Sequence, residues 1–320
     1  MKKKTKTLII ITAVLVLLLL AAVLIISHYL GSINREDPSD FEPTPAPIES
    51  LPPVENDPYS DEETRAQIEP FLDDDLLNIL LVGQDARPGE GRQRSDSMIV
   101  CSINLETKEV SLISFLRDLY VEIPGSSPNR LNTPYVYGGF ELLKETLRHN
   151  FGISIDGCFE VNFDGFETVI DIVGGVDIKL TASEAQIVGV EAKEEGNHLN
   201  GEQTLTYSRI RSLDSDFMRT ERQRNVLMSV LRSARGRSFK ELAALAEEML
   251  PHMTTDLSKL QIMSMLFQCY KIMDGATVTP YRVPADNAYY YDTIRGMSVV
   301  VPNLPLIREQ LETYLPLNEK

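Results

Sequence analysis

Residues 8–30 form an apolar run that is mostly aliphatic and contains no charged side chain. About 20 such residues are enough to cross the hydrocarbon core of a bilayer, so we expect one transmembrane helix here. Four lysines lie before the run, whereas an arginine and two acidic residues at 35–37 follow it. The positive-inside rule therefore predicts a cytoplasmic tail over residues 1–7 and an extracytoplasmic location for everything after residue 30. We expect a single-pass type II protein of the cell membrane.

A cleaved signal peptide is the alternative explanation of this run. Signal peptides carry an apolar core of about 7 to 15 residues, followed by a small-x-small cleavage motif. Here the run is longer, and SHYLGS at residues 27–32 fits such a motif poorly. We therefore favour the uncleaved anchor.

Residues 31–75 have a different composition, with eight prolines, fourteen carboxylates and only two arginines. A segment so rich in proline and in like charges cannot bury a core, and its charges repel one another. We expect an extended extracytoplasmic linker that holds the following domain well away from the lipid surface.

The remaining chain, residues 76–320, is expected to form one extracytoplasmic catalytic domain. The whole chain has a net charge of −16, and subtracting the linker's −12 and the N-terminal lysines' +4 leaves −8 for this domain. A domain with an acidic balance is not a nucleic-acid binder by default. Nucleic acid is therefore not an expected partner.

Cysteine and histidine offer little material for catalysis. The three cysteines show no CxxC pattern, so neither a zinc site nor a dense disulfide framework is indicated. One of the four histidines, His28, falls in the predicted membrane span. A histidine-based triad or a histidine-ligated metal is therefore not favoured, and the chemistry must rest on other side chains.

Strand-like and helix-like patterns alternate along the domain. Short β-branched or apolar runs predict strands at 77–82, 98–104, 110–115, 158–163, 176–180, 277–283 and 297–301. Apolar residues at helical spacing predict helices at 135–149, 164–173, 217–233, 239–250, 257–272 and 304–314. Interleaved elements of this kind predict an α/β fold with a central mixed β-sheet covered by helices on both faces.

Two aspartates are expected at neighbouring strand ends. Asp85 follows the first predicted strand, and Asp96 leads directly into the next one. Ligands bind at the ends of strands in open α/β sheets, and two such carboxylates can bind a hard cation such as Mg2+ if phosphate oxygens or water complete its shell. The alternative is that both are turn residues that bond to their own backbone.

Arginines gather in this otherwise acidic domain. Arg117 and Asp118 stand where the third strand ends, and a second group of arginines spans residues 209–224. On a helix that starts near Asp216, Arg219 and Gln223 lie four residues apart and share a face with Arg222. Guanidinium forks match phosphate oxygens, and free N–H groups in the first turns of a helix also favour an anion.

Arg224 and Arg232 do not share the placement of Arg219 and Gln223 in the first turns of the helix. Arg224 should contribute little to anion binding if it lies on the outer face. The alternative for the whole group is a solvated basic helix face. Arginines together with the two aspartates favour a site for an anion and a metal ion instead.

The sequence resembles the LytR-CpsA-Psr family of cell-envelope proteins from about residue 75 to the C-terminus, and in its anchor and linker. The resemblance rests on several motifs that occur in order: NILLVGQDAR at 78–87, RSD at 94–96, SFLRD at 114–118, VEIPG at 121–125, LN at 131–132, YGG at 137–139, GF at 165–166, DIVGGVD at 171–177, LNGEQTLTYSR at 199–209, DFMRTERQ at 216–223 and GMSVVVP at 296–302.

This resemblance implies Mg2+-assisted (or Mn2+-assisted) transfer of a teichoic acid, capsular or related glycopolymer from a polyprenyl-pyrophosphate carrier to peptidoglycan. By motif match, Asp85 and Asp96 would hold the metal. The pyrophosphate would be bound by Arg94, Arg117, Arg209, Arg211, Arg219 and Gln223. The residues expected to take part in catalysis are Asp85, Arg94, Arg117 and Asp118. The family also implies an apolar pocket for the prenyl tail, for which we expect a lining of Phe163, Phe166, Val169 and Ile170.

We hypothesise that the C6 hydroxyl of an N-acetylmuramoyl residue attacks the phosphorus on the glycan side, and that Asp85 or Asp118 takes its proton. Positioning and charge neutralisation dominate phosphoryl transfer, so no activated Ser, Cys or His is needed. A pyrophosphatase in which water is the acceptor, and a non-catalytic envelope regulator, are the alternatives.

Overall fold

The computed structural model describes residues 33–36, 58–59, 69–86 and 91–318. The predicted transmembrane helix at residues 8–30 lies outside these residues. Within the described part of the chain, no helix is both long enough and apolar enough to cross a membrane.

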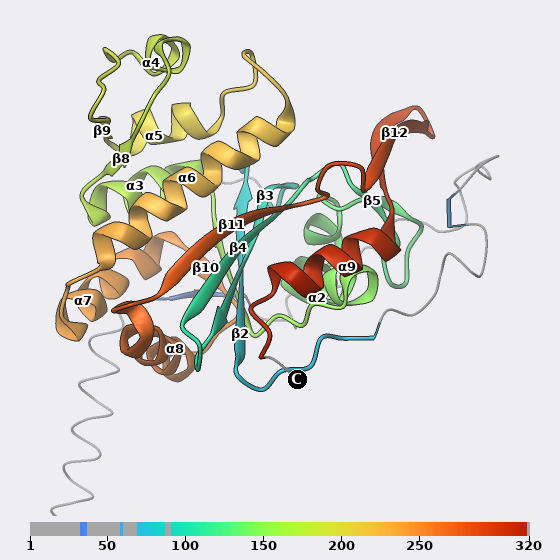
Figure 1. Ribbon diagram of the computed structural model, residues 1–320, viewed down its shortest axis with the longest axis horizontal. Helices are drawn as coiled ribbons and strands as arrows, with labels where there is room; N and C mark the ends of the chain where they lie inside the picture. Colours follow the sequence, from blue (N-terminus) through green and yellow to red (C-terminus); the bar gives the residue numbers. More distant parts are fainter. Residues whose placement is uncertain (1–32, 37–57, 60–68, 87–90, 319–320) are drawn as a thin grey trace, which may run out of the picture.

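A seven-stranded sheet forms the centre of the domain (Figure 1). In spatial order its strands are β1 (Asn34–Arg35), β10 (Thr254–Thr255), β7 (Gly157–Val161), β2 (Leu76–Gln84), β3 (Ser95–Asn104), β4 (Glu109–Phe115) and β11 (Thr277–Val283). The β1/β10, β2/β7 and β4/β11 pairs are parallel, and the other neighbouring strands are antiparallel. The prediction of a mixed sheet is confirmed.

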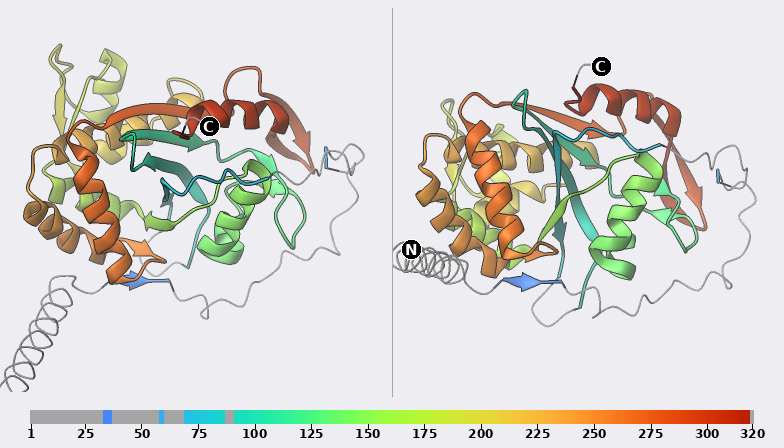
Figure 2. Two further views of the ribbon diagram at one scale, coloured as in Figure 1. Left: turned by 60° about the horizontal axis from the view of Figure 1, so that its bottom comes forward. Right: turned by 90° about the horizontal axis from the view of Figure 1, so that it is seen from below.

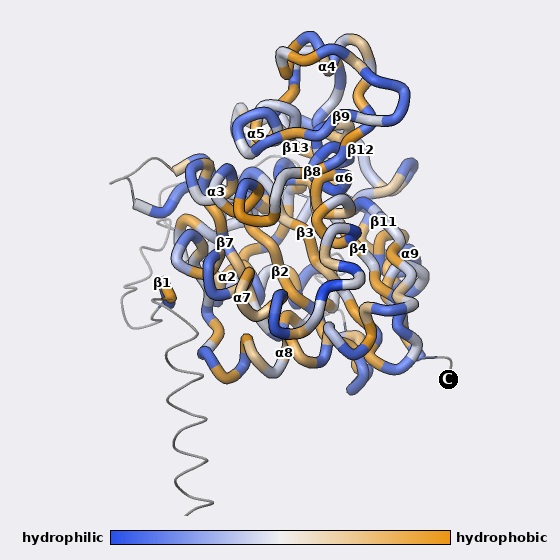
Figure 3. Tube along the Cα trace, turned by 90° about the vertical axis from the view of Figure 1, so that its left-hand side faces the viewer, coloured by the Kyte–Doolittle hydropathy of each residue, from blue (hydrophilic) through white to orange (hydrophobic). Residues whose placement is uncertain are grey.

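Helices cover both faces of the sheet because successive strand residues point to opposite sides. In β2, Leu80 and Val82 belong to the core under α2 (Pro134–Phe151) and α9 (Leu304–Tyr314). Their neighbours Ile79 and Leu81 belong to a second core, which α6 (Asp216–Ala234) and α8 (Lys259–Met273) close. Figure 2 shows the two helical layers on either side of the strands, and Figure 3 shows hydrophobic residues concentrated along β2 and β3.

Smaller units flank the central sheet. Beyond α3 (Phe163–Val173), the two-stranded sheet of β8 (Val176–Ile178) and β9 (Asn197–Leu199) packs with α4 (Ala182–Val188) and α5 (Gly201–Ser208). Two further two-stranded sheets pair β5 (Tyr120–Val121) with β6 (Asn129–Arg130) and β12 (Tyr289–Ile294) with β13 (Met297–Pro302). Helix α7 (Phe239–Met249) continues into the 3-10 turn η3 (Leu250–His252). The strands predicted at 176–180 and 297–301 therefore exist, but they lie outside the central sheet.

Parts of the acidic linker pack on the domain. Asn34 and Arg35 form an edge strand on β10, and the Glu36 N–H donates to the Thr255 carbonyl at 2.9 Å. Farther along, Tyr59 is only 2% exposed and donates its hydroxyl hydrogen to the Tyr120 carbonyl. The prediction that residues 31–75 are purely an extended spacer is wrong for these residues, because an open sheet edge and a buried aromatic side chain hold them.

Candidate active site

The antiparallel pairing of β2 with β3 brings the two predicted metal ligands to neighbouring strand ends. Gln84, the last residue of β2, pairs with Ser95, the first residue of β3, across a register irregularity. Asp85 follows Gln84 directly and is exposed, whereas Asp96 is half-buried. The side chain of Gln84 accepts a hydrogen bond from the Gln93 N–H at 2.8 Å, which ties the segment before β3 to the end of β2.

Asp96 is the centre of an ion-pair network. Its Oδ1 accepts a hydrogen bond from Arg117 Nη1 at 2.6 Å, and its Oδ2 lies 3.4 Å from Arg211 Nη2. Arg117 follows β4, and its Nε lies 3.6 Å from both Asp118 Oδ2 and Asp216 Oδ2. Burial opposes the charge of Arg117, but the bond to Asp96 and the nearby carboxylates outweigh it and raise the pKa of Arg117. Its guanidinium is therefore firmly charged.

Arg219 is the most deeply buried cation of the network, with only 2% of its surface exposed. Its Nη2 lies 2.8 Å from Asp216 Oδ1 and 3.4 Å from the Asp96 carbonyl. Its Nε has no hydrogen-bond partner among the described residues. Burial, together with the neighbouring Arg117 and Arg211 charges, lowers the pKa of Arg219 to about 10. At neutral pH this residue is still a cation, and it has an unused donor.

Two members of the network carry no predicted role. Asp216 bridges Arg117 and Arg219, and Arg130 lies 3.4 Å from Asp118 Oδ1 and donates to the Ser298 carbonyl. In the sequence, Asp216 appears only as the start of a helix. Arg130 comes from β6, for which the sequence shows no strand pattern. A residue can be assigned to a strand end from sequence only when the sequence predicts that strand.

An apolar cavity of about 300 Å3 opens beside this network. Its lining includes all four residues expected for the prenyl pocket, Phe163, Phe166, Val169 and Ile170. It also includes five of the polar residues predicted for the site, Asp96, Arg209, Arg211, Arg219 and Gln223. An apolar cavity therefore lies next to the arginines, with the four expected residues in its lining, but its volume of about 300 Å3 does not show the unusually long enclosed groove that we expect for a prenyl tail.

The cavity changes character along α6. Arg219 and Gln223, in the first turns of the helix, line its polar part, and Val226, Leu227 and Val230 line its apolar part farther along. At 1.5 Å per residue, the stretch from 219 to 230 covers roughly 16 Å. The cavity thus offers charged groups at one end and hydrocarbon at the other.

Arg209 also lines the cavity. It ends α5, and its guanidinium carbon lies 4.1 Å from the centroid of the Phe163 ring. Stacking on an aromatic face leaves the edge of a guanidinium free to bind anions. Arg209 is therefore held in place by the ring, and no carboxylate among the described residues pairs with its guanidinium.

Two other arginines of α6 do not belong to the site. Arg222 is predicted to share a face with Arg219, but it is buried on another side of the helix, where it pairs with Glu184 at 2.7 Å and with Asp214. Arg224 does not lie on an outer face, since it is only 7% exposed. The spacing of arginines on a helix does not show which of them meet internal carboxylates or a neighbouring core.

Arg94 and Asp85 stand apart from the cavity. Both are exposed, and neither lines it. Within the described residues, no group of three or more His, Cys, Asp or Glu side chains is placed to hold a metal ion. The donors available are the two carboxylates of Asp85 and Asp96, which suit a hard cation only when further oxygen ligands are supplied.

The model described as the LytR_cpsA_psr family matches residues 53–312. The chain belongs to this family. Its curated relatives include the regulatory protein MsrR of Staphylococcus aureus (strain COL), which is 35% identical over 164 residues covering 50% of each chain. They also include the polyisoprenyl-teichoic acid–peptidoglycan teichoic acid transferase TagU of Bacillus anthracis (strain A0248), 38% identical over 170 residues covering 52% of this chain and 54% of TagU. The chain spans about half the length of the curated relatives it matches.

Solved structures share the fold of this LytR_cpsA_psr family member. B. subtilis TagV has a TM-score of 0.61 at 26% identity, covering 78% of this chain and 100% of TagV. TagT bound to LIIa-WTA has a TM-score of 0.63 at 24% identity, covering 76% of this chain and 92% of TagT. YwtF (TagT) with bound octaprenyl pyrophosphate lipid has a TM-score of 0.58 at 22% identity, with the same two coverages.

Proposed function

We propose that this protein is an envelope phosphotransferase that moves an anionic glycopolymer, such as a teichoic acid or capsular polysaccharide, from a polyprenyl-pyrophosphate carrier to peptidoglycan. One observation carries the proposal: the guanidinium groups of Arg209, Arg211 and Arg219 line the same cavity as a set of apolar side chains. A ligand that suits both parts has a doubly charged head and a hydrocarbon tail. The family, TagU's name and the lipid bound to TagT support the same substrate class.

The charge arrangement favours exchange of a carboxylate for a phosphate. In the free protein, Asp96 and Asp216 form ion pairs with Arg117, Arg211 and Arg219, and these two carboxylates leave one of the three positive charges uncompensated. A pyrophosphate oxygen can accept from the same guanidinium groups. Arg219 Nε is buried and has no hydrogen-bond partner among the described residues. The first turn of α6, which Ser215 does not cap with its side chain, adds a positive dipole end.

The proposal includes a metal ion, Mg2+ or Mn2+, which Asp85 and Asp96 would hold. Both donors are hard oxygens at neighbouring strand ends, and the substrate's phosphate oxygens supply the remaining ligands. Such an ion would neutralise charge on the transferred phosphoryl group. Both oxygens of Asp96 face guanidinium groups, so binding a metal there requires Arg117 and Arg211 to turn toward the phosphates.

In the proposed reaction, the oxygen of the C6 hydroxyl of an N-acetylmuramoyl residue attacks the phosphorus on the glycan side. A new P–O bond to peptidoglycan forms, the P–O–P bridge breaks, and polyprenyl phosphate leaves with the bridging oxygen. Arg117 and Arg219 stabilise the negative charge that develops on the leaving phosphate. The acceptor's proton passes to Asp85 or Asp118. Asp118 faces the guanidinium groups of Arg117 and Arg130, and a carboxylate of Asp85 that ligates the metal cannot at the same time act as a free base.

The test is transfer of glycan from a synthetic polyprenyl-pyrophosphate donor to peptidoglycan by the full chain in lipid vesicles with Mg2+. We expect glycan attached to peptidoglycan and free polyprenyl phosphate in equal amounts. Free glycan phosphate without attachment would identify a pyrophosphatase. Lipid binding without either product, unaffected by Arg117→Ala, would identify a regulator.

The type II topology also forms part of the proposal. Protease added outside wall-less cells should therefore remove the domain.

A further inference from the structure

The chain that follows the predicted membrane span is fixed to one edge of the domain. Ile33 packs against the hydrophobic cluster of Leu250, Leu257 and Ile262. Next to it, the Asn34 side chain donates to the Pro251 carbonyl at 3.0 Å, and β1 pairs with β10. Backbone and side chain together hold the segment at this edge.

This attachment limits the distance between the edge and the predicted membrane span. Only residues 31 and 32 separate the end of the apolar run from Ile33. Three steps of about 3.8 Å between successive Cα atoms cover at most roughly 11 Å. The edge that carries β1, β10 and η3 must therefore lie close to the bilayer surface.

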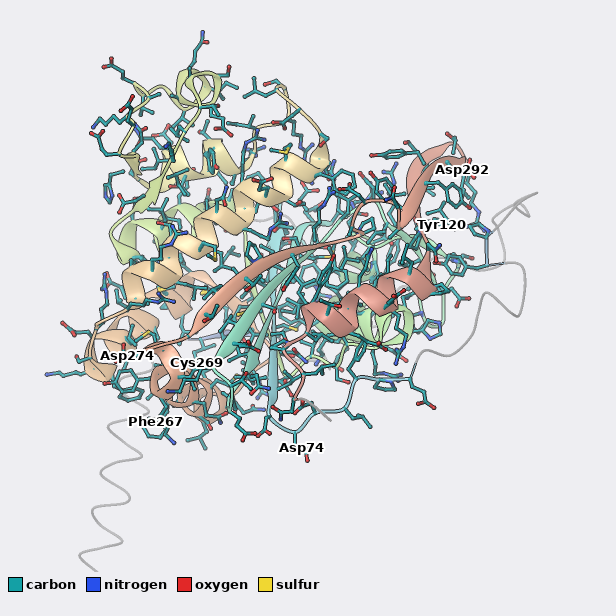
Figure 4. The ribbon with its side chains drawn as sticks, viewed as in Figure 1. Asp74, Tyr120, Phe267, Cys269, Asp274 and Asp292 are labelled. Atoms are coloured by element: carbon teal, nitrogen blue, oxygen red, sulfur yellow. The ribbon has the colours of Figure 1, made fainter. Side chains whose placement is uncertain are left out.

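The neighbouring helix α8 presents apolar side chains outward on the same side. Leu260 is 70% exposed and Phe267 is 47% exposed. With Ser264 and Lys271 they recur at intervals of three or four residues, which places all four on one helix face. Lys271 Nζ lies 4.4 Å from the centroid of the Phe267 ring, so a cation accompanies the aromatic side chain. Figure 4 shows Phe267 and Asp292 at opposite corners of the domain.

The apolar part of the cavity adjoins this edge. Met249 and Met253, which flank η3, both line the cavity. Between them lies Pro251, whose carbonyl accepts from Asn34. The cavity follows α6 for only about 16 Å, whereas the hydrocarbon core of a bilayer is about 30 Å thick. A prenyl chain that stays anchored in the bilayer while its head binds the arginines must have part of its length outside the cavity.

We infer that the edge formed by β1, β10, η3 and the outer face of α8 rests on the lipid bilayer, and that the prenyl tail enters the cavity past Met249 and Met253 while the rest of the tail stays in the membrane. The inference rests on the predicted anchor and on the proposed function. Leu260 and Phe267 insert into the interface between headgroups and acyl chains, as apolar side chains with a flanking lysine do on membrane-surface helices.

The first experiment measures depth in the membrane without any turnover. Full-length protein with Cys269→Ser receives one fluorophore through Leu260→Cys, Phe267→Cys or the control Asp292→Cys, and is placed in vesicles that contain lipid-attached quenchers. We expect strong quenching at 260 and 267 and none at 292. Equal quenching at the three positions would overturn the docking claim, whatever the protein's activity.

The second experiment tests how the tail enters. The double variant Leu260→Glu/Phe267→Glu is compared with wild type on a long-chain donor embedded in vesicles and on a short-chain donor dispersed in detergent. We expect about a tenfold lower rate on the embedded donor and an unchanged rate on the dispersed one, because charges oppose insertion into the interface. Tyr290→Glu, an exposed aromatic position on β12, should change neither rate.

The outcomes separate the inference from the proposed function. Equal rates of the double variant and wild type on the embedded donor would overturn the docking surface as the path of the tail. An equal loss on both donors would also overturn it, because it would show damage to the site or the fold. No transfer by wild type on either donor would refute the proposed function, and the quenching experiment would still decide the docking claim.

Discussion

Asp96 Oδ1 and Arg117 Nη1 lie 2.6 Å apart, and this ion pair joins the start of β3 to the residues that follow β4. It gives Asp96 two possible roles, as a metal ligand and as the partner that holds Arg117. The two roles predict different behaviour for the two aspartates at the strand ends. Asp85 has no ion pair among the described residues, so a change there affects metal binding without disturbing Arg117.

Asp85→Asn should remove most of the metal-dependent activity and leave the fold intact, because the exposed carboxylate supports no internal contact that the structure describes. Mg2+ binding, measured by titration calorimetry with a non-transferable prenyl pyrophosphate present, should weaken by at least about tenfold. Asp96→Asn should weaken it similarly and should also lower the melting temperature, since Arg117 loses a carboxylate. Unchanged Mg2+ affinity in both variants would eliminate the proposed metal site.

Arg219→Ala should lower the transfer rate by about two to three orders of magnitude. Loss of one charge-assisted contact in a site shielded from water commonly costs about 2 to 4 kcal/mol of transition-state stabilisation. Arg219→Lys should show an intermediate loss, because it keeps the charge without the fork. The control is Arg232→Ala on the exposed side of the same helix, with rates from the synthetic donor. Equal rates for the Arg219 and Arg232 variants would remove Arg219 from the site.

The choice of Arg232 as control shows where sequence reasoning ends. Arg224 belongs to the same run of arginines, but its burial makes its loss a change in the core. A helical period predicts which residues share a face, and it correctly joins Arg219 with Gln223. Which face meets a cavity and which meets Glu184 depends on α4, a short helix that no apolar period reveals. The site residues at the ends of strands with long apolar runs were therefore predictable. Their ion-pair partners on short helices and strands, such as α4 and β6, were not.

The same distinction holds for the fold. The strands of the central sheet that carry long apolar runs, such as β2 and β3, were predicted within a few residues. Strands β1 and β10 consist of two residues each, and they form because β10 pairs with the edge of β7 and β1 in turn pairs with β10. Composition predicts a spacer for residues 31–75, but pairing at a sheet edge depends on tertiary contacts, which composition does not contain.

Arg222→Met should destabilise the domain by about 3 to 5 kcal/mol at pH 7, because it leaves the buried Glu184 carboxylate without its cation. Burial alone would raise the pKa of Glu184, but hydrogen bonds from Arg222 and Thr181 outweigh it and lower the pKa. A lowered folded-state pKa stabilises the wild type above the ordinary value near 4.5, and this contribution disappears as the pH falls through the folded value.

The measurement is urea unfolding of wild type, Arg222→Met and the exposed control Arg232→Met between pH 7 and pH 3. The difference between wild type and Arg222→Met should shrink as Glu184 becomes protonated. Arg232→Met should follow wild type at every pH. A difference that stays constant down to pH 3 would show that the pair with Glu184 does not stabilise the fold.

Val230→Phe should separate tail binding from head binding. Val230 lines the apolar part of the cavity, so a larger side chain occupies part of its roughly 300 Å3 while the guanidinium groups keep their places. We expect about a tenfold higher KM for a long-chain donor, because the apolar contacts of the tail are lost. Inhibition by inorganic pyrophosphate, which has no tail, should stay the same.

Val190→Phe is the matched control, since Val190 packs against the same hydrophobic cluster but does not line the cavity. If Val230→Phe leaves the KM of the long-chain donor unchanged, or weakens pyrophosphate inhibition to the same degree, the cavity along α6 does not hold the prenyl tail.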